Sequence, residues 1–222
     1  MNNKLTERLQ LLADLVLPGK PAADIGTDHG YLGLYLLESG KCPFAVLSDV
    51  NEGPLAKAKQ NMEESSVDES LYSIRLGGGL ATLQPGEAAS IVIAGMGGEL
   101  IASILEEFPE KTASAELLIL QPRTRSGELR NWLWSNGYAI KGEYLVRERG
   151  RICEVITAAR GKQAPGDPDI PETDSPLLAE FLDGRIGSIK RIIEGLEKSG
   201  RDSAALKERL KAHEERRLRC GD

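Results

Sequence analysis

The chain is poor in cysteine, with three in 222 residues, and these three lie far apart in the sequence. Cys42, Cys153 and Cys220 include no C-x-x-C pair. An odd and scattered set of this kind argues against a disulfide framework and against a zinc site. We therefore expect reduced thiols, no bound metal and a cytoplasmic protein.

Long apolar runs are also lacking. No window approaches the roughly eighteen consecutive apolar residues of a transmembrane helix, so we expect no membrane partner. The first residues contain no apolar segment of the kind that a secretory signal requires. The composition, 41% hydrophobic and 28% charged, is ordinary for a globular protein, and the length fits one domain with an appendage.

Charge is unevenly distributed along the chain. The net charge of −6 does not favour general binding of nucleic acid. From Arg185 to the end, however, 11 Lys/Arg outnumber 7 Asp/Glu (+4), whereas the preceding residues hold 17 and 27 (−10). A basic tail on an acidic body can bind phosphate, or it can be the solvated face of a charged helical pair. Both interpretations stay open at this point.

Short apolar strands alternate with helical segments over the first 160 residues. The predicted strands are 22–25, 44–49, 71–76, 91–94 and 117–121, and the predicted helices are 5–16, 31–38, 54–64, 98–108 and 128–135. Such alternation implies an α/β fold with a parallel sheet and helices on both faces. A last pair of strands, 138–146 and 151–159, is too closely spaced for a crossover and should be antiparallel. Ligands of such sheets bind at the carboxyl ends of the strands.

The C-terminal part reads as a separate helical unit. Residues 161–175 are rich in Gly, Pro and Asp and are predicted to form a linker. Apolar residues then follow a heptad pattern, at Leu182, Ile186, Ile189, Ile193 and Leu196. A break near residue 200 favours an antiparallel coiled-coil hairpin of two helices. We predict one domain over 1–162 and a linker with this hairpin over 163–222. A short coiled coil can form within one chain, so we expect a monomer.

A glycine-rich turn with the sequence DIGTDHG follows the first predicted strand, from Asp24 to Gly30. A dinucleotide site needs G-x-G-x-x-G close to a pyrophosphate. Here Asp28 stands in place of the central glycine, and its carboxylate would repel a pyrophosphate. The same carboxylate suits a cationic cofactor such as S-adenosylmethionine. The pattern D-x-G-x-x-x-G resembles the first motif of class I (Rossmann-like) methyltransferases; the alternative is an ordinary strand-to-helix turn.

The ends of the next strands carry further candidates. Asp49 closes the second strand, where a carboxylate can accept hydrogen bonds from ribose hydroxyls; the alternative role is an N-cap of the following helix. The segment Ala94–Gly98 contains three glycines and leaves the backbone bare. It lacks the Asp/Asn-Pro-Pro-Tyr motif that grips an exocyclic amine, so such an amine is not the expected target. Met96 can pack against a base or simply fill a gap.

Several arginines and one histidine have more than one interpretation. Arg123 and Arg125 follow the fifth strand, and Arg147 and Arg149 flank a tight hairpin. These guanidinium groups can bind phosphate or can serve surface solubility. His29 can act as a base, as a stacking partner for a base, or as a local cap.

Taken together, these segments resemble the bacterial tRNA methyltransferase family that modifies N1 of adenine 22 (TrmK). The matching segments are DIGTDHGYL (24–32), DV (49–50), EGPL (52–55), RL (75–76), GL (79–80), IAGMGG (93–98) and LILQP (118–122). The resemblance runs from about Leu5 to Ile156, and the helical hairpin fits the family's architecture. Gly78 departs from an Asp or Asn that would contact the cofactor adenine, and Arg123 replaces an Asn.

The resemblance implies S-adenosylmethionine as cofactor, S-adenosylhomocysteine as product and tRNA as substrate. The residues expected to bind the cofactor are Asp24, Gly26, Thr27, Asp28, His29, Gly30, Asp49, Val50, Gly77, Gly78, Ala94, Gly95 and Met96. The residues expected at the reacting base are Asp28, Tyr31, Gly95, Met96 and Gly97. Those expected to contact tRNA are Arg123, Arg125, Arg147 and Arg149, together with the basic hairpin.

Methylation of adenine N1 places modest chemical demands on the protein. N1 has an in-plane lone pair, so no general base is required and catalysis is mostly alignment. N1 lies on the pairing edge, so the base must be extruded. Two alternatives remain: a methyltransferase for a small molecule or protein, and a non-catalytic sensor of an adenosine cofactor. A nicotinamide-dependent dehydrogenase fits less well because of Asp28.

Overall fold

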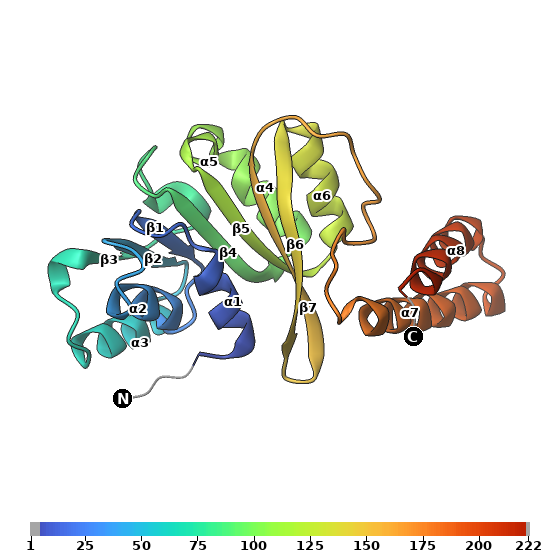
Figure 1. Cartoon of the computed structure of the whole chain (residues 1–222), viewed down its shortest axis with the longest axis horizontal. Helices are drawn as coiled ribbons and strands as arrows, with labels where there is room; N and C mark the ends of the chain where they lie inside the picture. Colours follow the sequence, from blue (N-terminus) through green and yellow to red (C-terminus); the bar gives the residue numbers. More distant parts are fainter. Residues whose placement is uncertain (1–4, 221–222) are drawn as a thin grey trace. The chain divides into compact units, whose positions relative to one another are not determined.

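The computed structural model describes residues 5–220, which form two compact units (Figure 1). The first unit ends at Pro168 and the second starts at Asp169. The predicted boundary lies slightly earlier, after residue 162. Residues 163–168 are tied to the first unit, because Gln163 Oε1 accepts a hydrogen bond from the Ile140 N–H (2.7 Å).

One seven-stranded sheet organises the first unit. Its strands are β1 (Ala22–Ile25), β2 (Ala45–Asp49), β3 (Tyr72–Leu76), β4 (Ser90–Gly97), β5 (Leu117–Thr124), β6 (Tyr138–Glu148) and β7 (Arg151–Arg160). The order is β3-β2-β1-β4-β5-β7-β6. Strands β1 to β5 pair in parallel, and β7 is antiparallel to both of its neighbours. The predicted parallel sheet with a closing hairpin is therefore confirmed.

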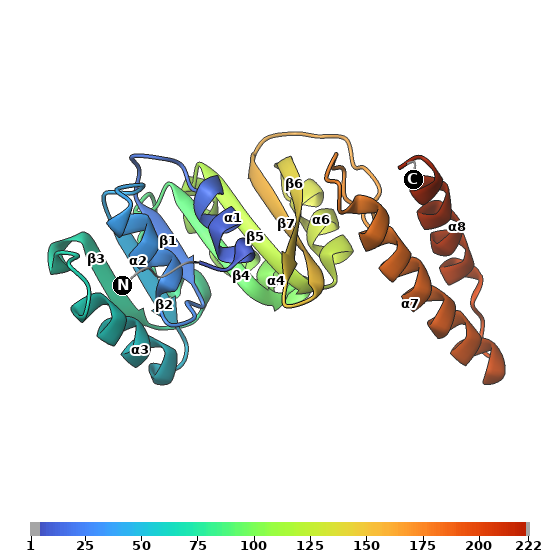
Figure 2. The same ribbon diagram turned by 60° about the horizontal axis from the view of Figure 1, so that its bottom comes forward.

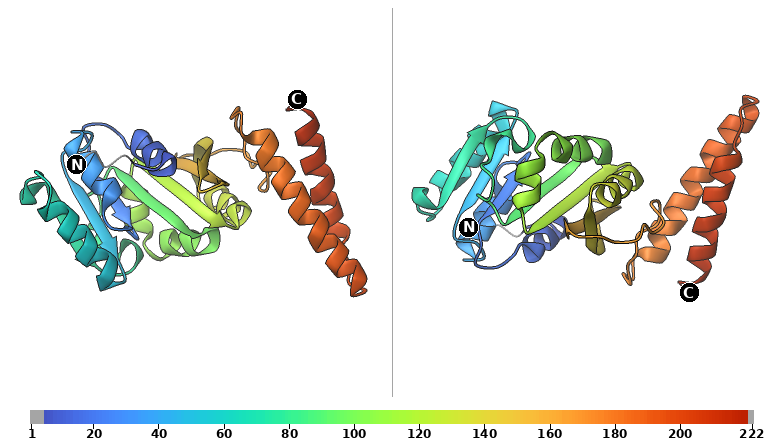
Figure 3. Two further views of the ribbon diagram at one scale, coloured as in Figure 1. Left: turned by 90° about the horizontal axis from the view of Figure 1, so that it is seen from below. Right: turned by 90° about the horizontal axis from the view of Figure 1, so that it is seen from above.

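Helices cover both faces of this sheet (Figures 2 and 3). They are α1 (Glu7–Leu15), α2 (Tyr31–Glu38), α3 (Glu52–Glu63), α4 (Gly98–Glu107), α5 (Pro109–Ser114) and α6 (Ser126–Ser135). Strand side chains alternate between two buried clusters: Ile91 and Ile93 pack with α4 and α6, whereas Val92 packs with α1, α2 and α3. Because both faces are buried, the strands read as continuous apolar runs.

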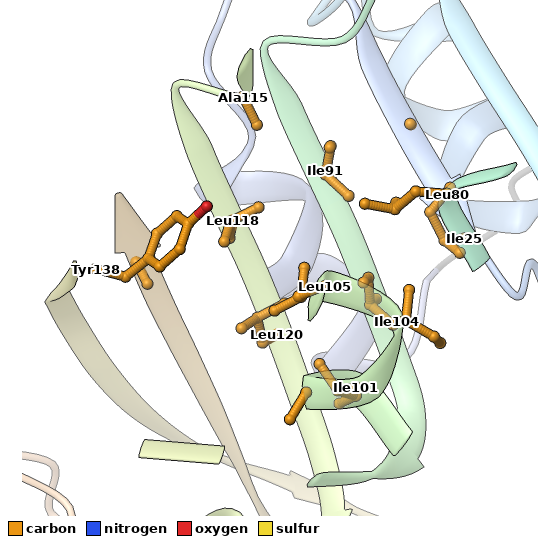
Figure 4. Packing of buried hydrophobic residues seen from close by; sticks show 14 of the residues in the cluster. Ile25, Leu80, Ile91, Ile101, Ile104, Leu105, Ala115, Leu118, Leu120 and Tyr138 are labelled. Carbon is orange, nitrogen blue, oxygen red and sulfur yellow. The ribbon is translucent and has the colours of Figure 1, made fainter. Parts of the chain in front are cut away.

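Helix α4 supplies the centre of one of these clusters (Figure 4). Ile101, Ile104 and Leu105 follow the i, i+3, i+4 spacing, and Leu105 lies beside Leu120 of β5 whereas Ile104 lies on the side of Ile25. Burying each such side chain stabilises the fold by roughly 1.5–3 kcal/mol. This packing anchors the helix whose first turn directly follows the end of β4.

Some elements differ from those predicted. The short helix α5 and two 3-10 turns, η1 (Glu69–Leu71) and η2 (Gly79–Thr82), were not predicted. Strand β4 continues through the glycines to Gly97, and β5 continues to Thr124. Strands β6 and β7 leave only Arg149 and Gly150 between them, both with positive φ (48° and 76°). That conformation is typical of a tight two-residue hairpin.

A cluster of buried charges joins α6 to the β6–β7 hairpin. The Arg130 side chain is fully buried, and its guanidinium contacts Glu143 and Glu154, each at 2.6 Å. Ser126 Oγ donates to Glu154 (2.8 Å), and Arg130 also donates to the Pro168 carbonyl (3.0 Å). Buried charges of this kind are tolerated only when they are paired. The cluster therefore holds α6, the hairpin and the end of the first unit together.

The second unit is the predicted antiparallel helical hairpin, formed by α7 (Leu178–Lys198) and α8 (Ala204–Leu218). Leu182, Ile189 and Ile193 of the predicted apolar seam are buried. The antiparallel register is visible in the ion pairs between the helices, Asp183–Arg217 (3.0 Å), Lys190–Glu214 (2.8 Å) and Glu197–Lys207 (2.7 Å). Across residues 5–220, the longest apolar helical stretch falls short of what a lipid bilayer requires.

The buried charge cluster yields a prediction about stability. Arg130→Met keeps the side-chain volume but removes the guanidinium that pairs with both buried carboxylates, Glu143 and Glu154. We expect the free energy of unfolding to fall by about 3–5 kcal/mol. Lys20→Met is the control, because Lys20 pairs with Glu116 on the surface, and we expect a change within about 1 kcal/mol. Urea denaturation measures both, and equal effects of the two variants would contradict the prediction.

Candidate active site at the carboxyl ends of the parallel strands

The strand order reverses between β1 and β4. Strands β2 and β4 flank β1 on opposite sides. The helices that follow β1 and β2 pack on one face of the sheet, and the helix that follows β4 packs on the other. Open α/β sheets bind their ligands at the carboxyl ends of the strands beside such a reversal. Most of the predicted site residues lie there.

The turn after β1 depends on Gly26. Its φ of +73° is a left-handed conformation, and a Cβ at this position would overlap the Met96 methyl group. The N–H groups of Gly26 and Thr27 donate to the Ser48 carbonyl, at 2.8 and 2.9 Å. The turn is thus tied to β2 by its backbone and contacts β4 through Met96. These two N–H groups are therefore already occupied within the protein.

Asp24 is the most perturbed acid of the site. Burial raises its pKa to about 6, against a hydrogen bond from Thr27 Oγ1 (2.6 Å) that lowers it. The nearby carboxylates of Asp28 and Asp49 raise the pKa further, and Arg8 opposes them. The ends of β1 and β2 therefore concentrate negative charge. Sequence reasoning missed Arg8, because a basic residue in the first helix carries no signal that it will lie near β1.

The exposed side of the same turn holds Asp28, His29 and Tyr31. The Asp28 carboxylate is 80% exposed and lies within hydrogen-bond distance of His29 Nδ1. The His29 ring stacks on Tyr31, with centroids 5.8 Å apart and an interplanar angle of 16°. His29 has a left-handed φ of 62°, and its carbonyl accepts from Asn61 Nδ2 (2.8 Å). The three predicted residues form one exposed, partly aromatic cluster.

Gly30 serves packing between helices and sheet. Its φ is +72°, and a Cβ would lie 2.9 Å from the Ala58 side chain and 3.1 Å from Leu47. This position therefore sets the close approach of α2 to α3 and β2, as the last glycine of a phosphate- or nucleoside-binding turn commonly does.

Asp49 and Val50 meet the segment after β3. Asp49 Oδ1 accepts from the backbone N–H of Asn51 (2.7 Å) and from its side-chain amide (3.0 Å). The Gly77 N–H donates to the Asp49 carbonyl (2.9 Å), and a Cβ at Gly78 would lie 3.6 Å from Val50. Val50 is 64% exposed. The N-cap position of α3 is Asn51, so the alternative role of Asp49 as the N-cap was wrong.

The loop after β3 is held by an arginine that sequence reasoning did not assign. Arg75 donates to the Thr82 carbonyl (2.6 Å) and forms an ion pair with Glu87. This pairing raises the pKa of Arg75 and lowers that of Glu87. The ion pair fixes the loop that contains Gly77 and Gly78. The only sequence signal was the position of Arg75 in a segment shared with the family.

The end of β4 is distorted by β-bulges. Its pairing with β5 shifts register between Ala94 and Met96 and again between Met96 and Gly97. Gly95 has a φ of +78°, and an added Cβ there would meet nothing within 4 Å. Gly98 has a packing role instead, since a Cβ would overlap the Arg125 carbonyl. Bulges often re-aim backbone and side chains beside active sites.

The four predicted tRNA-contacting arginines differ in their surroundings. Arg123 lies near the end of β5, and Arg147 and Arg149 lie at the end of the β6–β7 hairpin; all three are exposed. Arg125 forms an ion pair with Glu99 and lies 3.9 Å from Glu128. The charge of Arg125 is therefore largely compensated. Within residues 5–220, no group of three or more His, Cys, Asp or Glu side chains is arranged to hold a metal ion.

Comparison with known proteins gives matches over most of the chain. A family model described as a methyltransferase domain matches residues 5–156. The chain is 38% identical over 179 residues to the tRNA (adenine(22)-N(1))-methyltransferase of Bacillus subtilis. That alignment covers 81% of this chain and 75% of the relative.

Solved structures also match over nearly the full length. Streptococcus pneumoniae Sp1610, solved in complex with S-adenosyl-L-methionine, has a TM-score of 0.87 at 32% identity, covering 96% of this chain and 99% of that one. The m1A22 tRNA methyltransferase TrmK of B. subtilis has a TM-score of 0.79 at 32% identity, covering 97% and 96%. The similarity therefore includes the C-terminal helices as well as the sheet.

The raised pKa of Asp24 yields a prediction about stability and pH. A carboxyl whose pKa rises from 3.8 to about 6 on folding destabilises the protein when ionised, by roughly 3 kcal/mol at most. Its stabilising contribution is complete below pH 3.8 and is lost as pH rises through 6. Asp24→Asn keeps an acceptor for Thr27, so we expect the variant to be more stable than the wild type at pH 8. The gain should vanish near pH 4. Urea denaturation across this range measures it, and a variant less stable at pH 8 would contradict it.

Proposed function

Since the chain belongs to the family of bacterial tRNA (adenine-22 N1)-methyltransferases, we propose that it methylates N1 of adenine 22 in tRNA with S-adenosylmethionine as methyl donor. The observation that carries the proposal is the gathering of Asp24, Asp28 and Asp49 beside the strand reversal. A relative with the same fold and 32% identity binds S-adenosyl-L-methionine.

The residues gathered at the strand ends suit the chemical groups of S-adenosylmethionine. Its sulfonium centre supplies an electrophilic methyl group, and it also carries an ammonium group that carboxylates attract. Asp24 and Asp28 provide this negative charge, and Asp24 is ionised above pH 6. The second carboxylate oxygen of Asp49 is suited to ribose hydroxyls, while Oδ1 is held by Asn51. The exposed Val50 side chain offers an apolar surface to adenine, and the backbone N–H groups beside Gly78 are suited to its ring nitrogens.

The methyl transfer needs no proton transfer from the protein. The N1 lone pair of adenine forms the new N–C bond while the sulfonium's bond to the methyl carbon breaks and its electron pair stays on sulfur. N1 carries no proton, so none leaves, and the protein's task is to align the reacting atoms. We assign Gly95, Met96 and Gly97 to one wall of the base pocket. The stacked His29–Tyr31 pair is the candidate surface for the extruded base.

The tRNA requires a larger surface, which we assign to the helical hairpin, Arg123, Arg147 and Arg149. Double-helical RNA is recognised mainly by shape and by phosphate contacts. Several hairpin cations are held in ion pairs, among them Lys190, Lys207 and Arg217. Lys198 and Arg201, beside the turn between α7 and α8, are exposed. A tRNA substrate is consistent with a cytoplasmic location.

The direct test is transfer of labelled methyl from S-adenosylmethionine to unmodified bacterial tRNA, followed by nucleoside mass spectrometry. We expect N1-methyladenosine at position 22, and no product with a transcript that carries guanine at that position. Methyl at another nucleoside would retain the enzyme class and reject the target. Binding of cofactor without any transfer to tRNA would reject the proposal and favour a different substrate or a sensor.

The hairpin assignment predicts a selective loss of tRNA affinity. In a Lys198→Ala, Arg201→Ala variant, each lost phosphate contact should reduce the slope of log affinity against log salt by about one. Affinity for S-adenosylhomocysteine should not change, because both residues lie in the second unit. Lys20→Ala removes one charge before β1 and serves as the control. Filter binding at several salt concentrations measures the effect, and an unchanged slope in the double variant would count against the hairpin.

A further inference from the structure

Gln121 is a buried polar side chain at the end of β5, and the chemistry proposed above assigns it no role. It is 1% exposed. Its Oε1 accepts from the Gly95 N–H (3.1 Å), and its Nε2 donates to the Pro122 carbonyl (3.1 Å). A buried amide with both ends bonded is costly to disturb, because a buried donor or acceptor that loses its partner destabilises the fold.

The sequence of β5 explains why a side chain is needed at this place. Ala94 pairs with Gln121, and the next pair along the strands is Met96 with Pro122, so Gly95 has no partner residue in β5. Proline has no N–H and cannot donate to the neighbouring strand. Pro122 therefore cannot continue the regular ladder toward β4, and the bulge leaves Gly95 without a facing residue. The Gln121 side-chain oxygen supplies an acceptor for the Gly95 N–H at this point.

The bulge determines the shape of the segment that faces the reacting atoms. In the bulge, Gly95 has a φ of +78°, and no other atom lies within 4 Å of the position that a Cβ would occupy there. On the next residue, the Met96 methyl group packs against Gly26 in the turn after β1. Any shift of Gly95 therefore moves the wall assigned to the base relative to the turn assigned to the cofactor. Displacements of about 1 Å can cost a hundredfold in rate when catalysis depends on alignment.

We propose that Gln121 is a positioning residue for methyl transfer, which acts by holding the Ala94–Met96 bulge in the shape that aligns the base with the methyl group. The inference rests on the proposed function and extends it to a residue that contacts neither substrate nor cofactor. It predicts that loss of the Gln121 hydrogen bonds lowers the rate of transfer more than it lowers affinity for the cofactor.

The first test is Gln121→Met, which keeps the length and volume of the side chain but cannot accept from Gly95. We expect the single-turnover rate with saturating tRNA and S-adenosylmethionine to fall at least tenfold. The dissociation constant for S-adenosylhomocysteine should change less than the rate. Thr112→Val is the control, because Thr112 is also buried and hydrogen-bonded to backbone, at Leu105 and Phe108, but lies on α5 before the start of β5. The control should lose stability and keep the wild-type rate.

A second variant separates positioning from stability. Protonated glutamic acid offers the same acceptor and donor as glutamine, whereas the carboxylate offers Pro122 no donor. Burial raises the pKa of a carboxyl, so Gln121→Glu should regain activity relative to the wild type as pH falls from 8 to 6. A purely structural role would change the folded fraction but not the single-turnover rate of folded enzyme.

The outcomes distinguish the two proposals. A folded Gln121→Met variant within twofold of the wild-type rate overturns the inference and leaves the proposed function intact. If that variant does not fold, a pH-independent ratio of Gln121→Glu to wild-type rates overturns the inference instead. If the wild type itself transfers no methyl to tRNA, the proposed function fails and the inference fails with it.

Discussion

The contact between Gly26 and the Met96 methyl group is the constraint on which the site depends. It joins the carboxyl ends of β1 and β4, the two parallel neighbours between which the strand order reverses. A side chain at Gly26 would displace Met96 and would also force a left-handed backbone on a residue with a Cβ. The turn assigned to the cofactor and the wall assigned to the base are therefore in direct contact through Met96, and the turn is also held by its backbone hydrogen bonds to Ser48.

That contact in turn depends on the bulge opposite Pro122. A proline inside a regular strand removes a ladder donor, and here the loss coincides with the residue pair at which β4 leaves register. Gln121 Oε1 accepts from the Gly95 N–H, which has no facing residue in β5, so the irregular strand end is held by a specific hydrogen bond. The distortion is local, because the preceding pairs from Ser90 to Ala94 remain in register with β5. The sheet is thus regular up to Ala94 and ends in a bulged segment, Ala94–Gly97, beside the strand reversal.

Much of the fold was predictable from the sequence because both faces of the sheet are buried and its strands are short, apolar and separated by helical patterns. The alternation, the closing hairpin, the family and the C-terminal helical pair were confirmed. Helix α5 was missed because it has only six residues and no apolar period of its own. The strand character of 95–97 was missed because glycine disfavours strands, and the pairing with β5 that overrides this preference is tertiary.

The site was predictable only as a set of segments. Sequence motifs identified the turn after β1, Asp49 and the glycines after β4, which the fold brings to neighbouring strand ends. The contributions of Gln121 and Arg75 could not be derived, since each depends on a partner in another segment. Arg125 was expected to contact tRNA on the basis of its charge alone, and its ion pair with Glu99 could not be foreseen.

Two charged residues of the first unit, Arg130 and Asp24, differ in how completely their charges are paired within the protein. Arg130 forms ion pairs with two carboxylates, each at 2.6 Å. These pairs stabilise the fold, and the buried guanidinium is not accessible to a ligand. Asp24 accepts a hydrogen bond from the Thr27 hydroxyl, and the favourable charge of Arg8 is opposed by burial and by the carboxylates of Asp28 and Asp49. In the free protein the negative charge of ionised Asp24 is therefore only partly neutralised. A cationic ligand bound beside Asp24 would supply the missing positive charge. An acid that destabilises the free protein is thereby a source of affinity for a positively charged cofactor.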